Sequence, residues 1–376
     1  MADVIAYVKK PTHRTAIFIP ASGVPETITQ SASYVPTGTQ ALVRVKYSAV
    51  NPADRRHFYM GAHSYVAGYE WLGVVEAAGS QVSSVIVGDM LFGVTEIGHR
   101  RPMELGAHQD LLLTETGPGS ATYKIPQALH GNDDWLRHLV AWPSALMTAA
   151  DALFNCMGFG FPPTKGVIDG DDPKGKAILI WGGSSAVGLG AIYLASQAGF
   201  SLIYTTASPK NHEALLALGA TRCFDYRSPT VVDEICAAVA AKPGRKLTVV
   251  FDAVTTGTGF GEPKKEGVQI DLEKSSPALA ARCISDGVAK LSSTLPLPHD
   301  PRWTFCLVRR DSGETEYVRR IEATVAWALD QLASSGTSFR LPNIRVVKGA
   351  EAGIQAIHDV FEGRNSMEKY VIEHPL

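Results

Sequence analysis

The stretch with the clearest chemical meaning is a glycine turn that follows a short apolar run. Residues 177–181 are apolar, Gly182 and Gly183 follow, and small residues then continue at helical spacing. This order is typical of a buried parallel strand, a tight turn and a helix packed on a sheet. The free N–H groups at the start of such a helix bind phosphate, so the turn predicts a dinucleotide site or, since it departs from G-x-G-x-x-G, a plain structural turn. The dinucleotide interpretation uses five residues: Gly183, Ser184, Ser185, Ala186 and Val187.

The end of the next predicted strand indicates which dinucleotide is bound. In this kind of fold an Asp or Glu roughly 20 residues past the glycine turn binds the adenosine ribose diol. Here the strand at 201–206 is followed by Ala207-Ser208-Pro209-Lys210, with no acid. A hydroxyl and a Lys suit a ribose that carries a 2′-phosphate, because a carboxylate would repel that group. The sequence therefore predicts NADPH as the cofactor, not NADH.

Alternating strands and helices position this site. Strands are expected at 177–181, 201–206, 223–225, 247–252, 288–295 and 303–308, with helices at 211–218, 229–241 and 277–284 between some of them. Buried strands that alternate with helices of this length predict an α/β fold with a doubly wound parallel sheet. Beyond the sheet, an apolar stripe predicts a helix over 317–332, and a last helix over 350–361 lies between strands at 344–347 and 370–372.

The first 145 or so residues have a different pattern of predicted secondary structure. Short β-rich runs with turns between them are found at 15–18, 41–47, 73–79, 87–93 and 106–113. Such closely spaced strands predict a compact, barrel-like β domain. From Trp142 to Phe154 the pattern becomes helical, and a loop rich in Gly, Pro and Asp then leads to the glycine turn.

Composition sets the remaining bounds. A chain of 376 residues can hold two domains, and 45% apolar with 19% charged residues is ordinary for a globular protein. A net charge of −2 gives no reason to expect nucleic acid or an acidic membrane as partner. No apolar run approaches the roughly 18 residues of a spanning helix, and the first residues show no signal peptide. Five scattered cysteines without C-x-x-C spacing fit reduced thiols, so we expect a cytoplasmic protein.

Several motifs together resemble the medium-chain dehydrogenase/reductase superfamily, in its zinc-free branch. That branch contains quinone-oxidoreductase-like proteins and the trans-acting enoyl reductases of fungal polyketide pathways. The matching segments are Asn51-Pro52-Ala53-Asp54, Gly68-Tyr69-Glu70-Trp71-Leu72-Gly73, 143–149, 207–211 and 224–227. The resemblance implies a β-rich GroES-like catalytic domain at 1–146 and 310–376. A Rossmann domain at 147–309 is then inserted between its two parts.

The same comparison argues against a metal. The zinc alcohol dehydrogenases of this superfamily have a Cys where this chain has Asn51, a His where it has Tyr69, and a lobe of four cysteines. The region from 92 to 113 has no Cys at all. A tetrahedral Cys/His site cannot form from what remains, so we expect no bound metal.

The resemblance also implies roles for individual residues. Arg56 lies where related enoyl reductases carry a basic residue, which makes it the candidate contact to an oxyanion or acyl carbonyl; the alternative is a solvated surface Arg. Thr148 is expected to position the nicotinamide, or else is an ordinary helix residue. Asn51, Pro52 and Asp54 shape the ribose end of the site or only cap a turn.

For the adenosine end, the resemblance implies that three further residues join Ser208. Lys210 and Asn211 would contact the 2′-phosphate region, and Tyr226 would stack on the adenine. By contrast, the histidines have no metal-ligand spacing, so we expect all four of the following at the surface: His57, His63, His99 and His108. Ser184 and Ser185 do not read as nucleophiles, because their surroundings are not G-x-S-x-G.

These observations predict an NADPH-dependent, metal-free reductase of an activated C=C bond. The first interpretation is a trans-acting enoyl reductase that acts on a polyketide or other carrier-bound acyl thioester, with a polyketide synthase as possible partner. A quinone or small-enone oxidoreductase is the first alternative. A protein that binds NADPH without catalysis and serves a synthase as a scaffold is the second.

Overall fold

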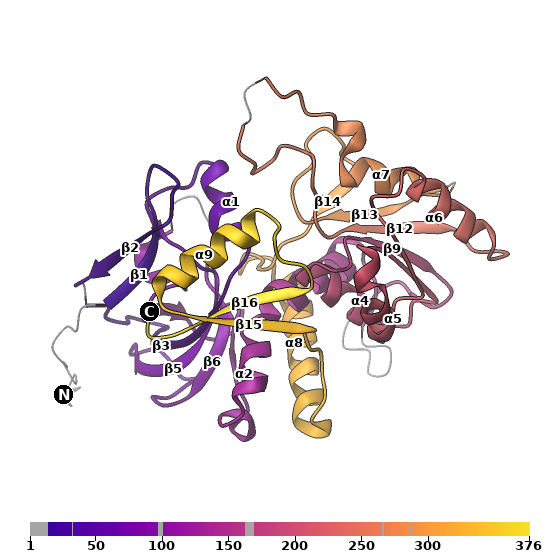
Figure 1. Cartoon of the computed structure of the whole chain (residues 1–376). Helices are drawn as coiled ribbons and strands as arrows, with labels where there is room; N and C mark the ends of the chain where they lie inside the picture. Colours follow the sequence, from indigo (N-terminus) through magenta and orange to yellow (C-terminus); the bar gives the residue numbers. More distant parts are fainter. Residues whose placement is uncertain (1–13, 32, 97–100, 162–168, 265–266, 286) are drawn as a thin grey trace.

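The chain folds into two lobes, one from both ends of the chain and one from its middle (Figure 1). The computed structural model describes residues 14–31, 33–96, 101–161, 169–264, 267–285 and 287–376. In Figure 1 the indigo N-terminal strands and the yellow C-terminal strands lie side by side in one lobe, and the orange middle forms the other.

The middle lobe contains a six-stranded sheet in which every neighbouring pair is parallel. Its order is β11-β10-β9-β12-β13-β14. The strands are β9 (Ala177–Trp181), β10 (Leu202–Thr206), β11 (Arg222–Phe224), β12 (Leu247–Asp252), β13 (Lys290–Ser293) and β14 (Trp303–Phe305). The predicted doubly wound sheet is confirmed. Its strand order reverses beside β9, and such a reversal is where ligands bind in open α/β sheets.

Helices of this lobe follow the strands in the expected alternation. They are α4 (Ala186–Ala198), α5 (His212–Leu218), α6 (Val231–Ala240) and α7 (Ser276–Arg282). Strand β9 is buried along its whole length, as its unbroken apolar sequence requires.

The other lobe is β-rich and joins the two ends of the chain. A seven-stranded sheet has the order β15-β16-β3-β5-β6-β8, with β7 paired to β3, and a three-stranded sheet has the order β2-β1-β4. The strands are β1 (Arg14–Ile19), β2 (Glu26–Gln30), β3 (Gln40–Ala49), β4 (Tyr65–Val66), β5 (Glu70–Ala78), β6 (Met90–Val94), β7 (Leu111–Glu115), β8 (Thr122–Lys124), β15 (Asn343–Lys348) and β16 (Glu368–Glu373). Because β16 pairs antiparallel with β3, Val371 opposite Ala49, the C-terminal segment completes the N-terminal sheet. This confirms that the parallel sheet is inserted into the β-rich domain.

Helical segments connect and cover the two sheets. They are α1 (Ala53–Tyr59), η1 (Met103–Leu105), η2 (Gln127–Leu129), α2 (Asp133–Leu139), η3 (Pro143–Met147), α3 (Thr148–Ala150), η4 (Asp151–Cys156), η5 (Pro209–Asn211), η6 (Leu272–Lys274), α8 (Thr315–Ser335) and α9 (Ala350–Phe361). The consecutive segments η3, α3 and η4 form the predicted helical run after Trp142 and bury their side chains almost completely.

Several predicted strands are shorter than expected; those at 288–295 and 303–308, for example, pair only over Lys290–Ser293 and Trp303–Phe305. The run at 87–93 begins pairing only at Met90, because Gly88 adopts a left-handed turn conformation (φ +92°). The run at 106–113 becomes a strand only at Leu111, since the backbone of Ala107 and His108 bonds instead to Gly68 and Ala67. Within the described ranges, no helix is both long and apolar enough to cross a membrane.

Candidate active site

The glycine turn lies between β9 and α4, at the strand-order reversal. Gly182 has a φ of +85°, and a Cβ on Gly183 would lie 2.0 Å from Thr205 Oγ1. Neither position tolerates a larger residue, so the backbone turns tightly onto β10. The turn delivers the chain into α4, where the N–H groups of Ala186 and Val187 have no acceptor among the described residues, and these residues therefore fit a dinucleotide.

The two serines of the turn differ in role. The Ser185 hydroxyl accepts a hydrogen bond from the N–H of Gly188 at 3.0 Å and donates to the Gly182 carbonyl at 2.9 Å, so it caps α4. The Ser184 side chain is half-buried and makes no hydrogen bond to another described residue. Of the two, Ser184 is the hydroxyl that remains available to a phosphate.

The predicted adenosine end gathers behind β10 and β11. Ser208 is nearly buried, and its hydroxyl accepts a hydrogen bond from Arg227 Nη2 at 3.0 Å. The Arg227 guanidinium also lies over the ring of Tyr226, 5.2 Å from its centroid. Tyr226 is 44% exposed and Lys210 is exposed, so both are accessible to a ligand. Asn211 is buried, and its amide donates to Ser366 Oγ at 2.9 Å, a bond that links this end to the C-terminal segment.

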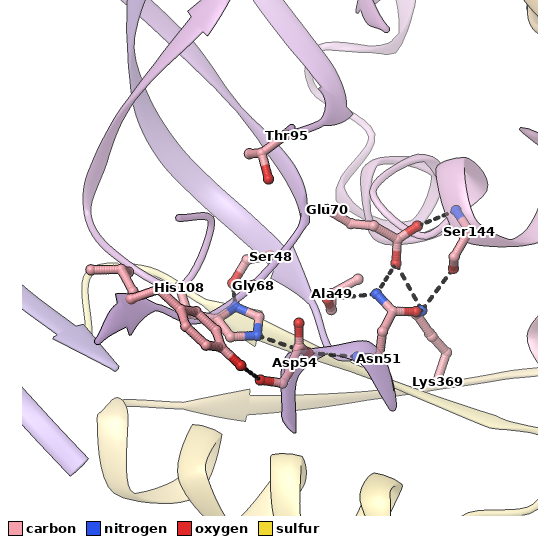
Figure 2. A network of polar contacts seen from close by, with 12 residues as sticks. Ser48, Ala49, Asn51, Asp54, Gly68, Glu70, Thr95, His108, Ser144 and Lys369 are labelled. Atoms are coloured by element: carbon pink, nitrogen blue, oxygen red, sulfur yellow. Dashed lines mark hydrogen bonds and ion pairs between the residues drawn. The ribbon is translucent and has the colours of Figure 1, made fainter. Parts of the chain in front are cut away.

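A buried ion pair lies in the β-rich lobe, hereafter the catalytic lobe, where this lobe faces η3 (Figure 2). The Lys369 ammonium contacts Glu70 Oε2 at 2.8 Å, Asn51 Oδ1 at 2.7 Å and Ser144 Oγ at 3.1 Å. Glu70 in turn accepts from the Ser144 N–H at 2.6 Å and from Asn51 Nδ2 at 2.7 Å. Glu70 and Lys369 are 1% and 5% exposed, so the charges are held by each other and by these polar neighbours. The cluster joins β16, β5 and the turn before α1 to the helical run that leads into the middle lobe, hereafter the cofactor lobe.

The Asn51 side chain is part of the Glu70–Lys369 cluster. Both amide protons of Asn51 are used, one toward Glu70 and one toward the Ala49 carbonyl at 3.3 Å. With Lys369 donating to its Oδ1, the Asn51 side chain is fully engaged with protein partners. Asn51 and Tyr69 stand at two places where the zinc relatives carry metal ligands, and here an ammonium group sits against Asn51. No group of three or more His, Cys, Asp or Glu is placed to hold a metal among the residues that the structure describes.

A second buried network overturns one prediction. His108 was expected at the surface but is completely buried. Its Nε2 lies 3.3 Å from Asp54 Oδ2, and its Nδ1 lies 2.9 Å from Ser48 Oγ (Figure 2). Asp54 Oδ2 also accepts from the Asn51 N–H at 2.7 Å, which is the turn-capping interaction. The polar sequence around His108 misled the prediction because its partners lie 54 and 60 residues away.

The other histidines have mixed outcomes. His63 is exposed, as predicted. His57 is half-buried, and its Nδ1 is hydrogen-bonded to the Tyr69 hydroxyl, so it is less exposed than His63. His99 lies outside the described residues.

Arg56 is not a solvated surface residue. Its aliphatic stem packs on Gly261, where an added Cβ would lie 2.5 Å from Arg56 Cγ. Its Nε is buried and has no hydrogen-bond partner in the described part of the chain. Burial lowers the pKa of the guanidinium, and the Glu262 carboxylate partly opposes that shift. Arg56 on α1 therefore contacts the connection between β12 and α7, which belongs to the other lobe.

Thr148 and Pro52 each lie at the start of a helical segment, α3 and α1 respectively. Thr148 begins α3 and is 7% exposed, and Pro52 is the residue that precedes α1. Two functional candidates escaped sequence reasoning: Lys369 and Ser144 were not singled out. The available signal for Lys369 was a lone cation at the edge of an apolar strand, Glu368-Lys369-Tyr370-Val371-Ile372.

Comparison with known proteins identifies the family. Residues 37–123 match the model of the alcohol dehydrogenase GroES-like domain. The trans-enoyl reductase himH of Aspergillus japonicus is 31% identical over 366 residues, covering 89% of each chain. The chain belongs to the medium-chain dehydrogenase/reductase superfamily.

Solved structures of the superfamily share the fold. An alcohol dehydrogenase superfamily protein from Novosphingobium aromaticivorans superposes with a TM-score of 0.70 at 20% identity, covering 97% of this chain and 100% of that one. A mycobacterial protein solved in complex with NADPH superposes with a TM-score of 0.65 at 20% identity, covering 96% and 100%. The chain is thus an oxidoreductase by family, and its fold is that of the superfamily.

Proposed function

We propose that this protein is an NADPH-dependent, metal-free enoyl reductase that acts in trans on an α,β-unsaturated acyl thioester. The observation that carries the proposal is Arg56, a desolvated cation that α1 holds against the cofactor lobe and whose Nε has no hydrogen-bond partner among the described residues. A reduction of this kind needs a donor for the oxygen on which charge develops, and a preformed cation in a dry site is a strong one. The similarity to himH, named a trans-enoyl reductase, supports this choice of substrate.

NADPH is the proposed cofactor, and two features support it. The strand β10 ends without an acid, and Ser208 and Arg227 stand together at that end. A phosphate placed there would meet a hydroxyl and a guanidinium, whose forked geometry suits it. The mycobacterial neighbour in the NADPH complex has the same fold.

The chain's own residues would act in sequence. The turn at Gly183 and Ser184 would hold the pyrophosphate, and Thr148 would lie at the nicotinamide. When bound, the cofactor supplies the hydride that adds to the β-carbon. Arg56 would hold the thioester carbonyl and stabilise the enolate oxygen as the C=C electrons move onto it. The Lys369–Glu70 pair would fix the turn before α1, and this would keep Arg56 in position against the cofactor lobe.

The proposal extends to substrate, partner and domains. The substrate would be a carrier-bound or free acyl thioester, delivered by a polyketide synthase that the himH name suggests. We also propose the domain limits 1–146 with 310–376 for the catalytic part and 147–309 for the cofactor part.

The experiment is an assay of NADPH consumption by the purified protein on an α,β-unsaturated acyl thioester, with a simple quinone alongside. Turnover of the thioester with little turnover of the quinone is the expected result. The reverse would make the protein a quinone reductase. Tight NADPH binding without turnover of either would leave a binding role beside a synthase.

A further inference from the structure

Apolar side chains are exposed on the long connection between β12 and α7, here called the arm (residues 253–264 and 267–275). Val268, Ile270 and Leu272 are 62%, 51% and 38% exposed, and polar residues lie between them. Exposed apolar groups gathered in this way mark a place where an apolar partner binds. We propose that the arm binds the aliphatic chain of the substrate, so that the protein selects long-chain acyl thioesters. This inference rests on the proposed function, because it specifies the substrate class of that site.

The arm starts against the glycine turn. Its first residues follow the carboxyl end of β12, and the carboxyl edge of a parallel sheet is where ligands bind. The Ala253 carbonyl accepts from the Ser185 hydroxyl at 3.2 Å, and a Cβ on Gly182 would lie 2.5 Å from Val254 Cγ1. The arm therefore packs directly on the turn that is proposed to hold the pyrophosphate.

Hydrogen bonds close the base of the arm. The Thr256 N–H donates to Ser276 Oγ at 2.9 Å, and the Ser276 N–H donates to the Thr256 carbonyl at 3.0 Å. Just before them, Thr255 has a left-handed conformation (φ +45°), and its N–H donates to Asp252 Oδ1 at 2.9 Å. Because its two ends are fixed to each other, the arm leaves the cofactor lobe in a set direction. Figure 1 shows it as the loop that rises at the top of the orange lobe, on the side of α1.

Farther along, the arm reaches the residue that is proposed to hold the thioester carbonyl. A Cβ on Gly261 would lie 2.5 Å from Arg56 Cγ and 3.5 Å from Met60 Cγ. Arg56 and Met60 are four residues apart, so they lie on one face of α1 where this helix ends. A Cβ on Gly259 would lie 2.1 Å from Ile270 Cδ1, so Ile270 folds back onto the stretch of the arm that contacts Arg56.

These contacts identify the occupant. A substrate whose carbonyl is held by Arg56 has Met60 beside it on α1 and Ile270 beside it on the arm, with Val268 two residues farther out. Because these apolar residues adjoin the Arg56 contact, the occupant that they fit is the chain of a substrate bound there. An aliphatic chain that covers them removes apolar surface from water, and each methylene group that is fully covered strengthens binding about fourfold.

The test measures kcat/KM for two N-acetylcysteamine thioesters, the 2-butenoyl and the 2-octenoyl ester. Their chains differ by four carbons, which would give about 250-fold if all four were fully covered, and we expect the wild type to prefer the octenoyl ester by about 30-fold or more. The double variant Val268→Ser/Ile270→Ser should lower kcat/KM for the octenoyl ester by about tenfold, mainly through KM. Its kcat/KM for the butenoyl ester should stay within about twofold of the wild type, with the Kd of NADPH unchanged.

Val288→Ser is the matched control. Val288 is 94% exposed and precedes β13, so it lies at the amino edge of the same sheet, opposite the edge that carries the glycine turn. This change should leave kcat/KM for both esters within about twofold of the wild type. If the double variant fails to fold, Val268→Ser alone serves as the test, and it should lower kcat/KM for the octenoyl ester by about threefold.

Three results would overturn the inference while the proposed function stands. They are a wild type without preference for the longer chain, a double variant that keeps its activity on the octenoyl ester, and equal losses on both esters, which would mean that the arm only holds Arg56 in place. If the active double variant also changed its mass in light scattering, the apolar residues would belong to an interface between proteins. If the wild type reduces neither ester while NADPH still binds, the proposed function fails and the inference falls with it.

Discussion

The two sides of the proposed site are built in different ways. The nucleotide side is a backbone structure: the turn between β9 and α4 is set by Gly182 and Gly183, which lie next to each other in sequence. The catalytic side is a structure of side chains, in which Glu70 and Lys369 meet across 299 residues of chain. The first depends on space for the backbone and the second on charge compensation, so the two sides should respond differently to substitution.

Breaking the ion pair should have the largest effect. Lys369→Met leaves the Glu70 carboxylate buried without a cation, and we expect a loss of about 3–5 kcal/mol in the free energy of unfolding. Urea denaturation measures it. Because removal of both charges avoids the uncompensated carboxylate, the double variant Glu70→Gln/Lys369→Met should regain part of the loss.

The exposed pair Lys348–Glu373 is the matched control. It also joins a Lys to a Glu between β15 and β16, at 3.1 Å, but the Lys side chain is 74% exposed. Lys348→Met should cost less than about 1 kcal/mol. If both Lys variants lost the same free energy of unfolding, burial of the pair would not increase its contribution to stability.

The nucleotide side has a buried charge of its own, which sharpens the contrast. Asp252, at the end of β12, is completely buried and accepts from Ser276 Oγ at 2.6 Å and from the Thr255 N–H at 2.9 Å, and none of its partners in the described part of the chain is a cation. Burial raises its pKa to about 6, and these hydrogen bonds oppose the shift only in part. Glu70 is paired with the Lys369 ammonium, whereas Asp252 has only neutral hydrogen-bond donors among the described residues.

The pH dependence of Asp252→Asn tests that difference. The folded pKa lies above the unfolded one, so the stabilisation of the protonated carboxyl is complete below about pH 4 and is lost as pH rises through about 6. Asn cannot ionise, so the stability of the variant relative to the wild type should rise between pH 4 and pH 7, by up to about 3 kcal/mol. Thermal unfolding across this range measures it, and a flat or falling difference would contradict the assignment.

Cofactor selectivity tests the nucleotide side directly. Arg227→Ala should weaken the binding of NADPH about 10- to 100-fold and leave the binding of NADH unchanged, because a charged hydrogen bond to the 2′-phosphate is lost. Lys210→Ala should weaken NADPH by only about two- to threefold, since Lys210 is exposed and no hydrogen bond to it is found in the described structure. Fluorescence titration gives both constants. If the affinities for NADPH and NADH fell equally, the 2′-phosphate would have to bind elsewhere.

The same contrast explains what sequence could predict. The parallel sheet, the glycine turn and the final helix 350–361 follow from local patterns, and the structure has all three. The partners of His108 and the pairing of Lys369 with Glu70 depend on which distant strands meet, and no local pattern carries that information. Polar sequence around a residue indicates exposure only when its polar neighbours face water. His108 itself faces Ser48 and Asp54, and its neighbour Gln109 bonds to the carbonyls of Met103 and Gly106.

The smallest expected effect separates the two serines of the turn. Ser185→Ala removes the cap of α4 and should cost about 1 kcal/mol of stability, because the Gly188 N–H loses its acceptor. Ser184→Ala should change stability by less than about 0.5 kcal/mol, because its hydroxyl has no hydrogen-bond partner among the described residues, yet it should weaken NADPH several-fold. Thermal unfolding and NADPH titration of both variants give the comparison. If Ser184→Ala alone lost stability, the hydroxyl would belong to the turn, and backbone N–H groups would be left as the sole phosphate contacts there.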